Sequence, residues 1–353
     1  MNLFSSGISS DRSKPIRDNS DNSGESRHEH SSLYGGQAII EGVMMKGPER
    51  TVAACRAPDG NIVHKILREG TDEQKRNFWY KTPILRGVLI LVDSLSIGYR
   101  ALMFSGEVAD PDSGPRNPFI ENTMMIGSLI IALIFFKYVP ILVAKGTLGV
   151  PPAEAERAGI ELLNASMAWS AVEGLVKIIL IIGYMLTIRA IFREIRRVFQ
   201  YHGAEHKTIN AYEAGVPLTV NDIEAYPTFH PRCGTSFMFA VILFSLLFAM
   251  MFPLITWWIA GDPRLALKIW VRLILHIIFL PIISAFGYEF IRLTARLNPN
   301  GLVMRFLTWP GRFFQKITAL EPERDMLEVA LVSMRHAMGI ENPEPEKDIS
   351  SAP

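Results

Sequence analysis

The sequence predicts an α+β protein: a small β-containing amino-terminal domain followed by a multi-pass α-helical membrane domain of about four spans. Hydrophobic residues make up 49% of the chain, and the mean hydropathy of +0.19 is high for a soluble protein. Many of these residues gather in long segments, of the length that a hydrocarbon core of about 30 Å requires. Shorter apolar runs with turn residues between them precede these segments and predict the strands.

Charge and cysteine content narrow the class of protein. Lysine and arginine together number 36, and aspartate and glutamate number 35, so no bulk charge indicates a nucleic-acid partner. The two cysteines, Cys55 and Cys233, lie far apart in the sequence and do not make a disulfide framework. A reducing compartment fits this usage better.

Three strands are predicted near the amino terminus. The run from Gln37 to Met45 predicts one strand with a glycine bend, and Thr51–Arg56 and Ile62–Leu67 predict two more. Pro58-Asp59-Gly60-Asn61 is a strong turn signal, so we expect the last two strands to form a hairpin. Glu41 is a carboxylate within an apolar run, and it is either an exposed edge residue or a buried acid that faces a site.

Four segments have the length and hydropathy of membrane spans. An earlier apolar segment, residues 84–103, differs because Arg86, Asp93 and Arg100 recur every seven residues and therefore share a face. This pattern predicts an amphipathic helix that lies on the membrane. The predicted spans are Thr123–Ala144, Ala171–Phe192, Phe237–Ile259 and Ile269–Phe290.

The second and fourth predicted spans contain ionisable residues. Lys177 lies in the second span, and Arg272 and His276 lie in the fourth. Charges at this depth are costly unless they lie near an end or face the interior of the helix bundle. We expect His276 to be a hydrogen-bonded packing residue rather than a ligand.

Basic residues cluster after the second and fourth spans, whereas the connection between the first two spans has fewer. The positive-inside rule therefore predicts a multi-pass protein of the cell membrane with both termini in the cytoplasm. The predicted segments are, in order, a disordered tail (1–33), a β-rich cytoplasmic domain (34–81), an amphipathic membrane-associated helix (82–108), a helical membrane domain (121–295) with a cytoplasmic His/Cys loop (193–234), cytoplasmic carboxyl-terminal helices (296–338) and a second disordered tail (339–353).

The stretch Tyr201-His202-Gly203-Ala204-Glu205-His206-Lys207 carries the strongest chemical signal. In a helix, His202 and His206 lie one turn apart on one face, and Glu205 projects from nearly the same side. Two neutral imidazoles beside a carboxylate suit a divalent metal, Zn²⁺ foremost. The pattern also reads as H-x-x-E-H, the inverted zinc-hydrolase motif. The alternative is a pair of surface or core histidines that bind nothing.

Two histidines do not complete a zinc site, which usually takes three or four protein ligands. His230 and Cys233, immediately before the third span, are the next candidates. Distant carboxylates are further candidates among which the sequence does not choose: Glu41, Glu213 and Glu321.

The number of ligands separates two functions. Three protein ligands leave a position for water, and Glu205 is then the predicted general base of a hydrolase at the cytoplasmic membrane surface. Four ligands (His202, His206, His230 and Cys233) make the site structural, in a non-catalytic scaffold or transporter. Two alternatives need no metal: an interaction protein, and an enzyme with Cys233 as nucleophile and His230 or His206 as base.

Several motifs occur in a fixed order along the chain. They are Gly35-Gly36-Gln37-Ala38-Ile39-Ile40-Glu41-Gly42-Val43-Met44-Met45, Tyr201 to Lys207, His230-Pro231-Arg232-Cys233-Gly234-Thr235, Gln315-Lys316-Ile317-Thr318, Glu321-Pro322 and Glu328-Val329-Ala330. Over about residues 34 to 335 the chain thereby resembles the bacterial YqhQ-like membrane proteins. That family is a domain of unknown function, often labelled a predicted metal-dependent enzyme, so the resemblance implies a membrane location and a metal, but no substrate. We expect membrane lipid as a partner and a small molecule, lipid or peptide as substrate, with homo-oligomerisation left open.

Overall fold

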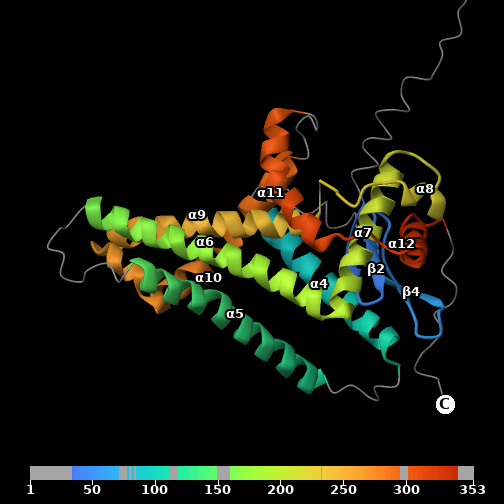
Figure 1. The fold of residues 1–353 in the computed structure, drawn as a ribbon, viewed down its shortest axis with the longest axis horizontal. Coiled ribbons are helices and arrows are strands. Elements are labelled where there is room, and N and C mark those ends of the chain that lie inside the picture. Colours follow the sequence, from blue (N-terminus) through green and yellow to red (C-terminus); the bar gives the residue numbers. More distant parts are fainter. Residues whose placement is uncertain are drawn as a thin grey trace, which may run out of the picture. The chain divides into compact units, whose positions relative to one another are not determined.

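The computed structural model is mostly helical, with a small antiparallel sheet at the start of its described part (Figure 1). It describes residues 34–70, 78, 82, 85–111, 118–148, 160–231, 233–294 and 301–340. The tail predicted over residues 1–33 lies outside the described residues, as does the second predicted tail from residue 341 onward.

The sheet has four antiparallel strands in the order β1-β2-β3-β4. The predicted turn at residues 58–61 joins β3 and β4 as a hairpin. The strands are β1 Gly35–Ile39, β2 Gly42–Lys46, β3 Arg50–Arg56 and β4 Ile62–Glu69.

The run from Gln37 to Met45 was predicted as one bent strand, and this was wrong. It forms the hairpin of β1 and β2, in which Ile39 pairs with Gly42 across the turn residues Ile40 and Glu41. Glu41 has a φ of 49°, in the left-handed region that tight hairpin turns use and that a glutamate rarely adopts. Arg197 binds the Glu41 carboxylate through two hydrogen bonds of 2.6 Å, which helps to hold this turn.

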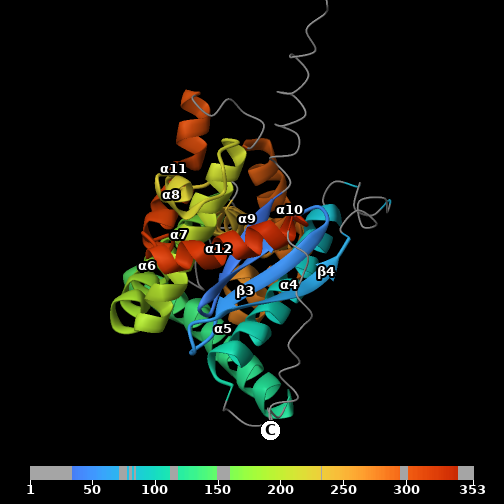
Figure 2. The same ribbon diagram turned by 90° about the vertical axis from the view of Figure 1, so that its right-hand side faces the viewer.

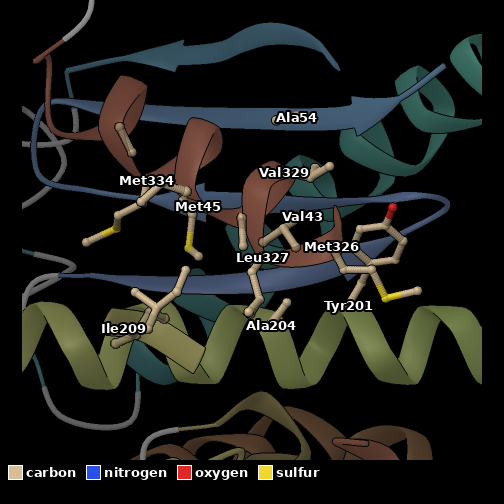
Figure 3. Close-up of a cluster of buried hydrophobic side chains, with 14 of the residues drawn as sticks. Val43, Met45, Ala54, Tyr201, Ala204, Ile209, Met326, Leu327, Val329 and Met334 are labelled. Atoms are coloured by element: carbon tan, nitrogen blue, oxygen red, sulfur yellow. The ribbon is translucent and has the colours of Figure 1, made fainter. Parts of the chain in front are cut away.

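Helices cover both faces of the sheet (Figure 2). Because successive side chains of a strand point to opposite faces, Val43 and Met45 join one core and Met44 joins the other. The first core lies against α7 (Arg193–Glu213) and α12 (Arg324–Ala337), whose side chains meet those of β2 and β3 in Figure 3. The second core lies against α4 (Leu85–Ala109) and includes Ile97, Ala101 and Phe104 from that helix.

Among the described residues, five helices are long and apolar enough to cross a membrane. Four of them coincide with the predicted spans, and the fifth is α4, which was predicted as an amphipathic helix on the membrane. The helices that match the predicted spans are α5 Pro118–Leu148, α6 Ile160–Ile191, α9 Gly234–Ala260 and α10 Ile269–Thr294.

The charges of α4 explain why its pattern is amphipathic. Asp93 accepts a hydrogen bond from Lys46 on β2 and pairs with Arg68 on β4 at 2.6 Å. Arg86, about two helical turns before Asp93 on the same face of α4, binds Glu289 of α10. Arg86 and Asp93 on the polar face of α4 therefore contact protein, whereas Arg100, Val92 and Leu95 are exposed.

The region 193–234, predicted as a loop, is largely helical. Phe192 has an extended backbone (φ −102°, ψ 114°) that separates α6 from α7, and α8 (Val220–Glu224) follows. Within this region, α7 packs against the strands β1 and β2 and against α12, which itself packs on β2 and β3. The other elements are the 3₁₀ helix η1 (Pro263–Leu267) and α11 (Leu302–Thr318), which contacts α9 and runs crosswise to it in Figures 1 and 2.

Candidate metal centre

The two histidines of the predicted motif lie side by side on α7. Their ring centroids are 4.4 Å apart, as expected for positions i and i+4 on one helical face. His206 is fully buried and His202 is partly buried. The helical spacing therefore brings the two imidazoles together, as the sequence predicted.

Backbone carbonyls fix the orientation of both rings. His202 Nδ1 lies 2.8 Å from the carbonyl oxygen of Thr318, and His206 Nδ1 lies 2.5 Å from that of Thr228. A carbonyl oxygen only accepts, so Nδ1 is the protonated nitrogen of each ring. Each Nε2 therefore carries a lone pair, which is the usual arrangement of a metal-binding histidine.

Cys233 brings a sulfur to these two lone pairs. His202 Nε2 lies 3.1 Å from Cys233 Sγ, and one ligand atom from each of His202, His206 and Cys233 lies within 4.8 Å of the others. We call these three residues the His/Cys trio. Two imidazoles and a thiol, a nitrogen and sulfur donor set, suit zinc.

Burial favours the neutral form of His206. Its removal from water lowers the pKa of His206 below the usual range, against an opposing contribution from Cys233. Its Nε2 is buried, and the Cys233 side chain is its hydrogen-bonding neighbour. A metal ligand must be deprotonated, so this environment holds the ring in the state that binding requires.

Glu205 faces a different neighbour from the two histidines. The backbone N–H of Gly36 on β1 donates a hydrogen bond to its carboxylate, while burial raises the pKa of Glu205. Its Oε2 has no hydrogen-bond partner among the described residues. A buried carboxyl with a raised pKa and a spare oxygen is a suitable proton acceptor.

His230 lies outside the His/Cys trio, although it was predicted as a ligand. Its ring centroid is 5.7 Å from that of His206, and its Nε2 lies 3.5 Å from a carboxylate oxygen of Glu213. Burial lowers the pKa of His230 to about 4, although the charge of Glu205 opposes this shift. His230 therefore interacts with the carboxylates of Glu205 and Glu213, beside the trio.

Two of the three distant carboxylates have other partners. Glu41 binds Arg197, and Glu321 pairs with Lys207 at 2.5 Å. Only Glu213 approaches a predicted ligand among the described residues, through its contact with His230.

Sequence reasoning missed the groups that position these side chains. Gln315 on α11 accepts a hydrogen bond from the backbone N–H of His230 and donates one to its carbonyl, at 3.0 and 2.9 Å. Gly203 lets Leu320 approach α7, because a Cβ at Gly203 would meet the Leu320 carbonyl oxygen at 1.8 Å. Both Gln315 and the Thr318 carbonyl acceptor belong to the motif Gln315-Lys316-Ile317-Thr318. This motif was therefore the sequence signal from which the two positioning groups could have been found.

Comparison with known proteins assigns the chain to a family but gives no activity. The family model described as "Protein of unknown function (DUF1385)" matches residues 82–340. The "Uncharacterized protein YqhQ" of Bacillus subtilis (strain 168) is 32% identical over 320 residues, 90% of this chain and 95% of that protein. No solved structure matches. The predicted family is confirmed, and the chain belongs to the DUF1385 family of YqhQ-like proteins.

Proposed function

We propose that this protein is a metal-dependent membrane enzyme, a hydrolase, whose Zn²⁺ is held by His202, His206 and Cys233. One observation carries the proposal: both rings donate Nδ1–H to backbone carbonyls, and their Nε2 atoms face the same sulfur. This arrangement is costly for histidines that only fill space, because two Nε2 lone pairs, one of them on the fully buried ring of His206, face one thiol, which has a single hydrogen to donate.

The roles of the surrounding residues follow from their positions. Three protein ligands leave one position for a water molecule, whose pKa bound zinc lowers towards about 7. Glu205 then accepts a proton from that water as general base. Gly36 orients the Glu205 carboxylate through its backbone N–H, and Thr318 and Thr228 keep the rings turned towards Cys233.

The proposed site lies at the membrane surface because its elements continue directly into apolar helices. The helix α7 follows α6 after one extended residue, and Cys233 immediately precedes α9. The basic residues after the second and fourth spans favour the cytoplasmic side and a cytoplasmic location for both termini. A lipid, small molecule or peptide that reaches this surface is the proposed substrate.

A structural metal site is the main alternative. Cys233 and His206 are buried, as ligands of structural zinc sites commonly are. In this case the metal joins α7 to the start of α9 and the protein is a non-catalytic scaffold or transporter.

The 3.1 Å contact between His202 and Cys233 favours a second alternative, a thiol nucleophile with a histidine base. The base in this alternative is His202 or the predicted His206, since both rings contact the Cys233 thiol.

Metal analysis of the full-length protein purified in detergent tests the metal itself. We expect about one zinc per chain in the wild type, no zinc in His206→Ala, and an unchanged content in His64→Ala, a histidine of β4 outside the trio. A wild type without zinc, after dialysis against zinc, overturns both metal proposals.

The role of Glu205 is tested on the zinc-loaded protein. We expect Glu205→Gln to keep its zinc and to lose at least about 100-fold in turnover of ester, phosphoester or peptide probes. Glu194→Gln, on an exposed position of the same helix, is the matched control. No turnover of any probe by the zinc-loaded wild type favours the structural metal site, and turnover that survives zinc removal favours the thiol.

A further inference from the structure

A second group of ionisable side chains lies among the apolar helices. Glu173 and Arg272 are each 1% exposed, and Arg272 Nε lies 2.9 Å from Glu173 Oε2. Lys177, one turn along α6, donates to the other oxygen of Glu173 at 3.3 Å. Lys137 on α5 interacts electrostatically with these three residues. We call Lys137, Glu173, Lys177 and Arg272 the charged cluster.

The charged cluster lies within the apolar helices, with Arg272 near the start of α10 and Lys137 near the middle of α5. Glu173 and Lys177 are roughly 9 and 15 Å along α6 from Met167, where the apolar segment begins, at 1.5 Å per residue. Ionisable residues at such depth are costly, and by default they mark a functional site.

The charges in the cluster do not balance. Two cationic side chains, those of Arg272 and Lys177, face the single carboxylate of Glu173, and the amine of Lys137 lies beside Lys177. The electrostatics therefore favour an additional negative charge beside the two lysines.

Hydrogen-bonding capacity points to the same conclusion. Outside the Glu173–Arg272 ion pair, three buried donors, Lys137 Nζ, Arg272 Nη1 and Trp169 Nε1, have no acceptor among the described residues, against one unpartnered acceptor, His276 Nε2. Arg272 Nη2 is satisfied by Ser170 Oγ at 2.6 Å. His276 does not add an anion, since its Nδ1 donates to the Arg272 carbonyl at 2.8 Å. A ligand rich in acceptor oxygens complements these donors.

A cavity adjoins the cluster between α6, α9 and α10. Its volume is about 130 Å³, and Glu173 and Lys177 form its charged wall while side chains such as Val241, Leu246 and Leu280 form its apolar wall. This volume is several times what one water molecule needs, about 10–15 Å³. There is room beside Lys177 for an anionic group with an apolar neighbour.

We propose that the charged cluster binds a phosphate-type oxyanion in this cavity at Lys177, whose neighbour Lys137 supplies a second amine. Glu173 stays paired with Arg272 and keeps the guanidinium in place, while Lys177 exchanges its long contact with Glu173 for the ligand. The phosphate belongs either to a phospholipid headgroup, with its acyl part against the apolar wall, or to a soluble phosphate. This site is independent of the proposed metal and of its chemistry.

The test uses the full-length protein in phosphatidylcholine nanodiscs. Its first arm measures binding of inorganic phosphate by calorimetry, and its second measures phosphatidylglycerol retained from mixed vesicles by native mass spectrometry. We expect Lys137→Gln to bind about tenfold more weakly in whichever arm shows binding. Lys145→Gln, an exposed lysine of the same helix, should bind like the wild type, and Lys177→Arg should retain binding.

Stability separates a ligand site from a purely structural ion-pair network. No described residue accepts a hydrogen bond from Lys137 Nζ, so Lys137→Gln should fold, melt at or above the wild-type temperature without ligand, and gain no stability from phosphate or phosphatidylglycerol. Phosphate binding identifies a soluble anion, and phosphatidylglycerol binding alone identifies a lipid headgroup. Binding in neither arm, or equal binding by the wild type and Lys137→Gln, overturns the proposal.

Discussion

The His/Cys trio and the charged cluster both bury polar side chains, but they hold them by opposite means. In the trio, backbone carbonyls bind the rings of His202 and His206, and the atoms left over are lone pairs. In the charged cluster, side chains bind one another as ions, and the atoms left over are donors such as Lys137 Nζ. The first arrangement suits a cation and the second suits an anion.

The difference also bears on stability. A site built from neutral groups can lose one member and leave no net charge behind. A buried ion pair that loses one partner leaves an uncompensated charge in a medium of low dielectric constant, which is strongly destabilising. The two sites should therefore respond very differently to single substitutions.

The largest effect should come from Glu173→Gln. This change leaves Arg272 and Lys177 without their carboxylate, and we expect a loss of about 3–5 kcal/mol in the free energy of unfolding. Cys233→Ala in metal-free protein removes only a thiol contact and should cost about 1 kcal/mol. Denaturant titration in detergent measures both, and equal losses contradict the ionic description of the cluster.

The next largest effect concerns the packing that positions the trio. Gly203→Ala places a Cβ against the backbone of Leu320, and we expect a loss of about 3 kcal/mol because backbone atoms do not move aside easily. Zinc affinity should fall about 10- to 100-fold, since the Thr318 carbonyl lies in the same displaced segment. Gly183→Ala on α6, with open space around it, is the control and should be neutral or mildly stabilising.

Much of this site was predictable because helical spacing alone brings His202 next to His206. The approach of Cys233 was predictable as a candidate, since it lies in a motif before the next apolar helix. The carbonyls of Thr228 and Thr318 were not, because every residue has a carbonyl and only the fold decides which one faces a ring. His230 was expected among the ligands, and its contact with Glu213 depends on the same tertiary packing.

In the sheet and the spans, too, contacts that depend on tertiary packing could not be predicted from the local sequence. The hairpin at residues 58–61 has turn residues that predict it, whereas the turn at Ile40 and Glu41 has none and depends on Arg197, far away in the sequence. Lys177 and Arg272 were recognised as charges inside spans. Their convergence on Glu173 requires the packing of two helices, which periodicity does not specify.

A smaller effect is expected from Gln315→Ala. The change removes two buried hydrogen bonds to the backbone of His230, which should cost about 1–2 kcal/mol. Gln200→Ala removes a single exposed bond to Glu321 and should cost less than about 0.5 kcal/mol. Thermal unfolding in detergent compares the two glutamines, and similar losses would show that the His230 segment does not depend on α11.

The smallest expected effect is a change in the rate of thiol labelling, and this rate reports most specifically on the trio. Burial raises the pKa of Cys55, with a further contribution from Glu41, and its side chain lies in the core between the sheet and α4. Cys55 should therefore react with N-ethylmaleimide only on unfolding. Cys233 should react in chelator-treated protein as the start of α9 opens locally, and zinc should slow that reaction at least about tenfold, because a metal-bound sulfur is not free to attack.

Variants assign the label without mass spectrometry. Cys55→Ala should leave the zinc-sensitive labelling unchanged, and Cys233→Ala should abolish it. His206→Ala separates metal protection from simple burial, because it keeps Cys233 in place but removes a ligand, so zinc should no longer slow the reaction. If zinc protects Cys233 equally well in His206→Ala, the metal binds without the His206 ring. The trio is then not a site in which two imidazole lone pairs converge on a cation, and its contrast with the donor-rich charged cluster no longer holds.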